Sequence, residues 1–151
     1  MSYKRILVPV DGSTPASRGL AEAVRLAKAG KSRLMLLHVV QEYSALAMPG
    51  AGVSIGPMLD AMKDGGKRVL AKSLKFAERA GVKPQTALVE NAVGGITGTV
   101  LREARRWKAD LIVVGSHSRT GVKRVLMGSD AESIARESPV PVLVVPSGKK
   151  R

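Results

Sequence analysis

Residues 111–136 read LIVVGSHSRTGVKRVLMGSDAESIAR. The stretch begins with an apolar run, Leu111 to Val114, that has the length of a buried strand. Gly115 and several small polar residues follow, and a helical pattern begins after Gly128 and Ser129. A strand that passes through glycine into a helix leaves backbone N–H groups and the positive end of the helix dipole free to bind an anion. The stretch therefore predicts a strand–loop–helix unit with a phosphate-binding loop.

Four further apolar runs have the length and composition of strands. They are continuous rather than alternating, which is typical of strands that are covered on both faces in a parallel sheet. They occupy residues 6–10, 34–40, 86–89 and 142–145. Amphipathic helical patterns separate the runs, at residues 16–27, 59–77, 96–104 and 131–135. This alternation predicts an α/β fold with a doubly wound, open sheet of five mainly parallel strands and about four helices.

Two helix starts carry capping signals. Thr14 is interpreted as an N-cap that is followed by Pro15 at the first helical position. Ser129 and Glu132 have the spacing of a capping box. The segment 45–57 is rich in glycine, alanine and proline and is expected to form a flexible loop, and residues 147–151 a basic tail.

Length and composition limit the class of protein. The 151 residues suit a single domain that spans the whole chain. No apolar run approaches the ~18 residues of a membrane span, and the first residues lead into a strand rather than a signal peptide. The absence of cysteine excludes disulfides and thiolate chemistry. A cytoplasmic location is expected.

The formal net charge of +13 would attract nucleic acid, anionic membranes or acidic partners. The basic residues are scattered, however, and their densest groups are Arg102, Arg105, Arg106 and Lys108, and the tail 149–151. One Phe, one Trp and two Tyr offer few rings for stacking on bases. A solvated basic surface is therefore favoured, and action on nucleic acid or membranes is an alternative that rests on charge alone.

Ligands of doubly wound sheets bind beyond the carboxyl ends of the strands, where the strand order reverses. Asp11 follows the first strand, in the sequence Asp11-Gly12-Ser13. Its carboxylate could accept hydrogen bonds from a ribose or an adenine amine, or approach a metal that phosphates hold. Alternatively, Asp11 only caps the turn into the first helix.

The second segment at this edge is His38-Val39-Val40, at the end of the second strand. The two valines could flank an adenine ring, whereas His38 is interpreted as a hydrogen-bonded core residue rather than a catalyst. His117 is the only other histidine. The spacing therefore supports neither a Ser-His-Asp set nor a two-histidine metal site.

The third segment is the loop that begins at Gly115. Gly115 and Gly128 lack a Cβ and would let the backbone approach a phosphate. The hydroxyls of Ser118 and Ser129 could donate to phosphate oxygens, and Arg119 could neutralise their charge. The alternative is a glycine-ended strand and a capped helix with no ligand. The loop has neither the Walker triplet nor the Gly-x-Gly-x-x-Gly pattern.

The chain resembles the universal stress protein family along nearly its whole length. The similar stretches are KRILVPVDGS at 4–13, LHVV at 37–40, the loop 115–129 and SPVPVLVV at 138–145. The resemblance implies a Rossmann-like fold of the adenine nucleotide alpha hydrolase type. It also implies a homodimer through the last strand, Val142 to Val145, and, in one branch of the family, ATP binding.

Gly115, Ser118, Gly128 and Ser129 fall at the four positions of that branch's glycine motif, and Ser118 replaces its second glycine. Position by position, the resemblance implies an adenosine side, a ribose and first-phosphate region, and a phosphate region. The corresponding residues are Pro9, Asp11 and Val39; Val114 and Gly115; and Ser118, Arg119, Gly128, Ser129 and Asp130. The Asp130 carboxylate suits the helix dipole but repels phosphate, unless it points away or helps to hold a divalent ion.

These observations predict a cytoplasmic protein that binds ATP with Mg²⁺ and acts as a nucleotide-dependent switch in the stress response. No residue is assigned as catalytic, because no side chain is placed as a base, and any hydrolysis is expected to be slow. The alternative is a nucleotide-free, dimeric interaction module of the same fold that acts through protein partners. Ser118 and Asp130 favour that alternative.

Overall fold

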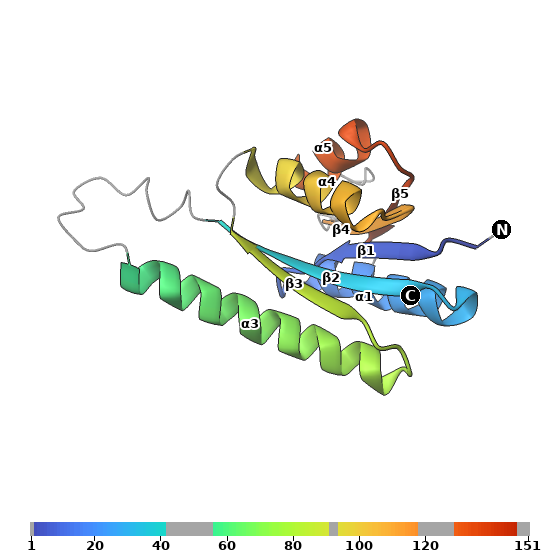
Figure 1. The fold of residues 1–151 in the computed structure, drawn as a ribbon, viewed down its shortest axis with the longest axis horizontal. Helices are drawn as coiled ribbons and strands as arrows, with labels where there is room; N and C mark the ends of the chain where they lie inside the picture. Colours follow the sequence, from blue (N-terminus) through green and yellow to red (C-terminus); the bar gives the residue numbers. More distant parts are fainter. Residues whose placement is uncertain (1, 42–55, 91–93, 118–128, 148–151) are drawn as a thin grey trace.

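The structure is a computed structural model of the chain, and it describes residues 2–41, 56–90, 94–117 and 129–147. Figure 1 shows a central sheet with helices on both of its faces. Strands and helices alternate along the described chain. In order they are β1 (Arg5–Pro9), α1 (Thr14–Gly30), β2 (Arg33–Val40), α3 (Gly56–Arg79), β3 (Gln85–Glu90), α4 (Gly95–Trp107), β4 (Leu111–Ser116), α5 (Ser129–Glu137) and β5 (Val142–Pro146).

The sheet has the strand order β3-β2-β1-β4-β5, and every neighbouring pair is parallel. This confirms the predicted doubly wound α/β fold. The chain builds outward from β1 to β3 on one side, and then crosses to β4 on the other side of β1. The strand order therefore reverses between β1 and β4, which is where ligands of such sheets bind.

Each face of the sheet has its own hydrophobic core. On one face, Ile6 and Val8 of β1 pack with apolar residues of α1 and α3. On the other face, Leu7 packs with apolar residues of α4 and α5. Both sets are almost completely buried. A strand that is covered on both faces needs apolar residues at every position, which explains the continuous runs in the sequence.

The structure corrects two local predictions. Ser13, not Thr14, is the N-cap of α1, because the Ser13 hydroxyl accepts a hydrogen bond from the Ala16 N–H at 3.3 Å. Helix α3 already begins at Gly56, so the last two residues of the predicted loop 45–57 are helical. Pro57 is tolerated as the second residue of α3, because the first N–H groups of a helix have no intrahelical partner.

Residues 147–151 were predicted to form a basic tail. Ser147 directly follows β5, and its N–H donates to the Ser116 carbonyl at 3.1 Å. The rest of that segment, and residues 42–55, lie outside the described residues. None of the described helices combines the length and the apolar character needed to cross a membrane.

Candidate functional site

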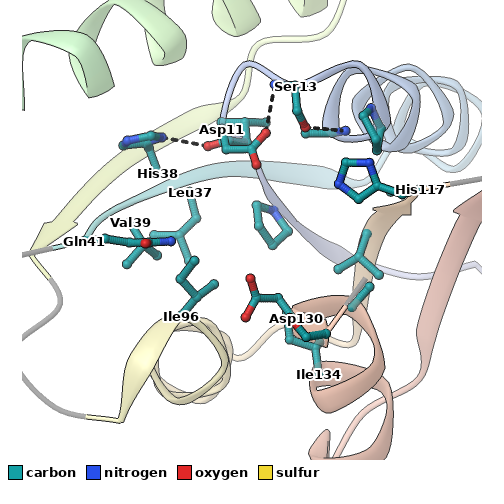
Figure 2. A pocket seen from close by; sticks show the side chains of 18 of the residues that line it. Asp11, Ser13, Leu37, His38, Val39, Gln41, Ile96, His117, Asp130 and Ile134 are labelled. Carbon is teal, nitrogen blue, oxygen red and sulfur yellow. Dashed lines mark hydrogen bonds between the residues drawn. The ribbon is translucent and has the colours of Figure 1, made fainter. Parts of the chain in front are cut away.

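A cavity of about 470 Å³ opens at the carboxyl ends of β1 and β4, where the strand order reverses. Five elements line it: the β1–α1 turn, the end of β2, the end of β4, and the first turns of α4 and α5. Met62 of α3 completes the wall. Figure 2 shows Val39, Gln41 and Ile96 on one side of the cavity, and His117 on the opposite side.

The β1–α1 turn forms one wall of the cavity and is fixed by its own hydrogen bonds. Asp11 Oδ1 accepts from the Ser13 N–H at 2.9 Å, and Gly12 adopts a φ of +81°, which favours glycine. Asp11 therefore caps the turn, as one interpretation predicted. It also lines the cavity, and its side chain is exposed. The two interpretations of Asp11 are compatible, because one carboxylate oxygen is sufficient for the turn.

His38 ties the end of β2 to the same turn. Its Nδ1 lies 2.8 Å from the Val10 carbonyl oxygen, and since a carbonyl can only accept, Nδ1 is the donor. The ring packs against Gly66 of α3, where a Cβ would lie 2.6 Å from His38 Cδ2. This agrees with the interpretation of His38 as a hydrogen-bonded structural residue that positions the turn below Asp11.

The part of the cavity near β2 is apolar. Leu37, Val39 and Ile96 contribute aliphatic side chains there, and Ile134 contributes another from α5. Such walls with a few polar groups at one end are typical of small-molecule sites. A flat, weakly polar ring would fit this part better than a charged group.

The amino-terminal turn of α5 forms the polar end of the cavity. Ser129 and Asp130 are its first two residues, and both are exposed. The Asp130 side chain points into the cavity in Figure 2. The positive end of the helix dipole attracts anions, whereas the Asp130 carboxylate repels them. An anion would therefore bind here most favourably together with a cation.

The structure brings most of the predicted site residues together. The cavity is lined by Pro9, Asp11, Val39, Val114, Gly115, Ser129 and Asp130. The other three predicted residues, Ser118, Arg119 and Gly128, lie outside the described part of the chain. The contacts of all ten with a ligand stay a prediction. Among the described residues, no group of three His, Cys, Asp or Glu side chains could hold a metal by itself.

Several lining residues were missed by the sequence reasoning. They include Gln41, Ile96, His117 and Ile134. Ile134 lies four residues after Asp130 and thus on the same helix face, which is a signal that the sequence did contain. The other three follow from the convergence of strand and helix ends at one sheet edge.

Gly115 also has a packing role, which the sequence did not predict. A Cβ at Gly115 would lie 1.8 Å from the Pro15 carbonyl oxygen of α1, so this space is filled by protein. Gly19 of α1 makes the reciprocal approach, since a Cβ there would lie 2.9 Å from the Gly115 nitrogen. The two glycines let α1 pack directly on β4, and they thereby place the turn with Asp11 beside the end of β4.

Comparison with known proteins agrees with this architecture. A sequence model of the universal stress protein family matches residues 2–146. A universal stress protein of Methanocaldococcus jannaschii is 34% identical over 148 residues, which cover 98% of this chain and 85% of that protein. One from Bacillus subtilis is 30% identical, over 95% of this chain and 99% of the other.

Solved structures show the same similarity. A crystal structure of a universal stress protein family member from Burkholderia pseudomallei has a TM-score of 0.79 and 32% identity, and the match covers 96% of this chain and 97% of the other. The universal stress protein UspA of Lactobacillus plantarum has a TM-score of 0.79 at 28% identity, over 96% and 99% of the two chains. On the match to 2–146 and these relatives, the chain belongs to the universal stress protein family.

Proposed function

We propose that the cavity at the carboxyl ends of β1 and β4 binds an adenine nucleotide, specifically ATP together with Mg²⁺. In this proposal the protein is a cytoplasmic regulator of the stress response whose state depends on the bound nucleotide. The observation that carries the proposal is the layout of the cavity, with apolar walls at β2 and a helix amino terminus at the other end.

The described residues are suited to the parts of a nucleotide. Val39 and Ile96 offer apolar contacts for the faces of the adenine ring. Asp11 offers carboxylate oxygens to ribose hydroxyls or to the adenine amine. The phosphates would then extend toward Ser129, at the amino terminus of α5.

Helix α5 is a better phosphate site than α1, although the amino termini of both helices line the cavity. In α1 the Ala16 N–H donates to the Ser13 hydroxyl, and the Ser17 N–H donates to the Ser13 carbonyl. Pro15 has no N–H. Since α1 has few N–H groups left to donate, the phosphates are expected at α5.

A divalent cation fits the acidic character of the phosphate end. Asp11 and Asp130 both line the cavity, and carboxylate and phosphate oxygens are the ligands that Mg²⁺ prefers. Mg²⁺ between the Asp130 carboxylate and the phosphates would remove the repulsion between them. Because too few ligands for a metal alone are described, the ion is expected to bind with the nucleotide.

Solved structures of the same fold support an adenine nucleotide as the ligand. One universal stress protein was crystallised in complex with cAMP, at a TM-score of 0.71, and one from Archaeoglobus fulgidus in complex with dAMP, at 0.69. They are 24% and 21% identical to this chain, so they share its fold. Their ligands have adenine and a phosphate in common, which matches the two ends of the cavity.

Two measurements test the proposal. Freshly purified protein is denatured and the released small molecules are identified by mass spectrometry, and the emptied protein is titrated with ATP and Mg²⁺ in a calorimeter. We expect released adenine nucleotide or a binding isotherm that Asp11→Ala weakens at least tenfold. Asp11→Asn is the matched variant, because its side-chain oxygen can still accept from the Ser13 N–H. If neither nucleotide nor binding heat is found, the proposal is wrong.

One observation favours a second function, an interaction module with an empty nucleotide site. It is the Asp130 carboxylate, which points into the region where phosphates would lie. In that case no nucleotide binds with or without Mg²⁺, whereas the protein still forms a dimer. Calorimetry with ATP, with and without Mg²⁺, therefore separates the two functions, since a dimer is expected for both.

A further inference from the structure

A second cavity lies between α1 and α3, and it shares no lining residue with the cavity at the strand ends. Its volume is about 380 Å³. We call it the α1–α3 groove. Gly12 forms part of its wall, and Ser17 and Leu20 line it from α1. The remaining lining residues all belong to α3.

Helix α3 contributes one continuous stripe to the groove. The stripe consists of Gly65, Arg68, Val69, Lys72, Ser73 and Phe76. These positions are separated by three and four residues, so they lie on one helix face. From Gly65 to Phe76 the stripe is roughly 16 Å long at the rise of an α-helix. The groove thus has the length of about five residues of extended chain.

The floor of the groove is apolar. Leu20 is 4% exposed and lies at its base, with Val69 half-buried beside it. Phe76 lines the groove at the end of the stripe and is 46% exposed, as one of the few large apolar side chains that the described surface leaves open to solvent. An apolar side chain from another molecule would bury part of this ring.

The charges in the groove are all positive. Arg68 and Lys72 are four residues apart, and no Asp or Glu lines the groove. Within the described residues, neither cation has a carboxylate within ion-pair distance, whereas Arg25, Arg136 and Lys63 each have one. The electrostatic complement of this pair is therefore an anion that the described part of the chain does not supply.

We propose that the α1–α3 groove binds a short acidic segment of a protein partner. Carboxylates of the segment pair with Arg68 and Lys72, and an apolar side chain between them contacts Leu20, Val69 and Phe76. Ser17 and Ser73 line the same groove. The Ser17 hydroxyl donates to the Ser13 carbonyl at 3.0 Å, so its oxygen is left to accept from a backbone N–H of the segment.

The shape of the groove favours a peptide over the other anionic partners of a basic protein. Leu20 lies recessed between two helices, where a side chain can reach it and a planar lipid surface cannot. Nucleic acid binds through rows of phosphate contacts and stacked rings, and the groove offers two cations and one ring. An acidic segment with one apolar anchor uses both features of the groove.

The experiment uses an array of short synthetic peptides in which glutamates surround a leucine or a phenylalanine at varied positions. Matched peptides carry glutamine in place of every glutamate, or serine in place of the apolar residue. We expect selected acidic peptides to bind, and each change to weaken binding at least tenfold. Backbone amide NMR signals of Gly12, Gly65 and Phe76 should shift when the peptide is added. If no acidic peptide binds better than its glutamine counterpart, the proposal is wrong.

Variants separate the groove from the general positive charge. The double variant Arg68→Glu/Lys72→Glu reverses the charge of the groove. The double variant Lys67→Glu/Lys75→Glu makes the same change in net charge on α3, but outside the groove. We expect the first to lose peptide binding and the second to retain most of it, with both showing the far-UV circular dichroism of the wild type. Equal losses would overturn the proposal. The proposal would also be wrong if no acidic peptide binds, and if anionic vesicles or a single-stranded oligonucleotide bind in a way that requires Arg68 and Lys72.

Discussion

Gly115 shows how a single missing Cβ can determine the position of a whole helix. The structure leaves no room for a side chain between β4 and Pro15 of α1. We expect Gly115→Ala to destabilise the protein by about 2–3 kcal/mol, since either α1 or β4 must move. Gly65→Ala is the control, because a Cβ there meets only the end of the Arg68 side chain at 3.8 Å. It should stabilise α3 by about 0.5–1 kcal/mol. Urea denaturation measures both changes, and equal midpoints for the two variants would contradict the packing explanation.

The same glycine shows what a sequence can reveal about a residue. The pattern of a strand followed by glycine drew attention to Gly115 as a ligand residue, which stays a prediction, and it did not reveal the packing role that the structure shows. Its contact with Pro15 joins segments a hundred residues apart, and such a contact has no local signature. Asp11 was the reverse case, because Asp-Gly-Ser is local turn chemistry and the sequence offered the turn cap, seen here as the hydrogen bond to Ser13, as one of its two interpretations.

Asp130 allows a test of the proposed Mg²⁺ dependence. Its carboxylate is expected to repel ATP unless a cation lies between them. Asp130→Asn removes the charge and nearly preserves the size of the side chain. We expect the variant to bind ATP at least threefold more tightly than the wild type in the presence of EDTA, and to gain less from added Mg²⁺. Calorimetry in buffer with EDTA and in buffer with Mg²⁺ measures the difference. An unchanged Mg²⁺ dependence would mean that the cation does not bind next to Asp130.

At the scale of elements, the start of α1 depends on the cap at Ser13. We expect Ser13→Ala to lower stability by about 1 kcal/mol, because the Ala16 N–H loses its acceptor. Thr14→Ala should change stability by less than about 0.5 kcal/mol, since Thr14 is an exposed helical residue. Thermal and chemical unfolding of the two variants measure this difference. If Thr14→Ala loses more stability than Ser13→Ala, Thr14 is the N-cap after all, as the sequence predicted.

The elements themselves were largely predictable. All five strands lie where continuous apolar runs occur, and the four described helices lie where apolar residues share a face. Their ends were harder to predict. Helix α3 starts at Gly56, three residues before Leu59, where the predicted apolar pattern begins. The walls of the site were also hard to predict. Ile96, for example, lines the cavity only because α4 packs over β2.

At the scale of the whole molecule, the described residues present two concave surfaces of opposite charge. Asp11 and Asp130 line the cavity at the strand ends, and Arg68 and Lys72 line the groove on the α1–α3 side. The net charge of +13 does not reveal this division, because composition says nothing about where the charges lie. The surfaces meet at one turn, since Asp11 and Ser13 face the cavity and Gly12 faces the groove.

Strand β5 is an edge of the sheet, and we expect it to pair with β5 of a second copy. The Pro141 carbonyl accepts from the Ile112 N–H, and the Ser147 N–H donates to Ser116, so odd-numbered residues bond to β4. Because backbone groups alternate along a strand, Val142 and Val144 direct their N–H and C=O groups outward. The valine-rich strand is only half-buried in the isolated chain. An unpaired apolar edge of this kind promotes association.

This alternation makes the dimer testable by one proline. Val144→Pro removes an N–H that points outward and leaves the bonds to β4 intact, so we expect a folded monomer. Leu143→Pro removes an N–H that points to β4, and should instead destabilise the sheet by about 3 kcal/mol. Light scattering after size exclusion gives the mass, and circular dichroism reports the fold. If Val144→Pro stays dimeric, the two copies do not pair through this strand, and the half-buried valines of β5 must pack against a different surface.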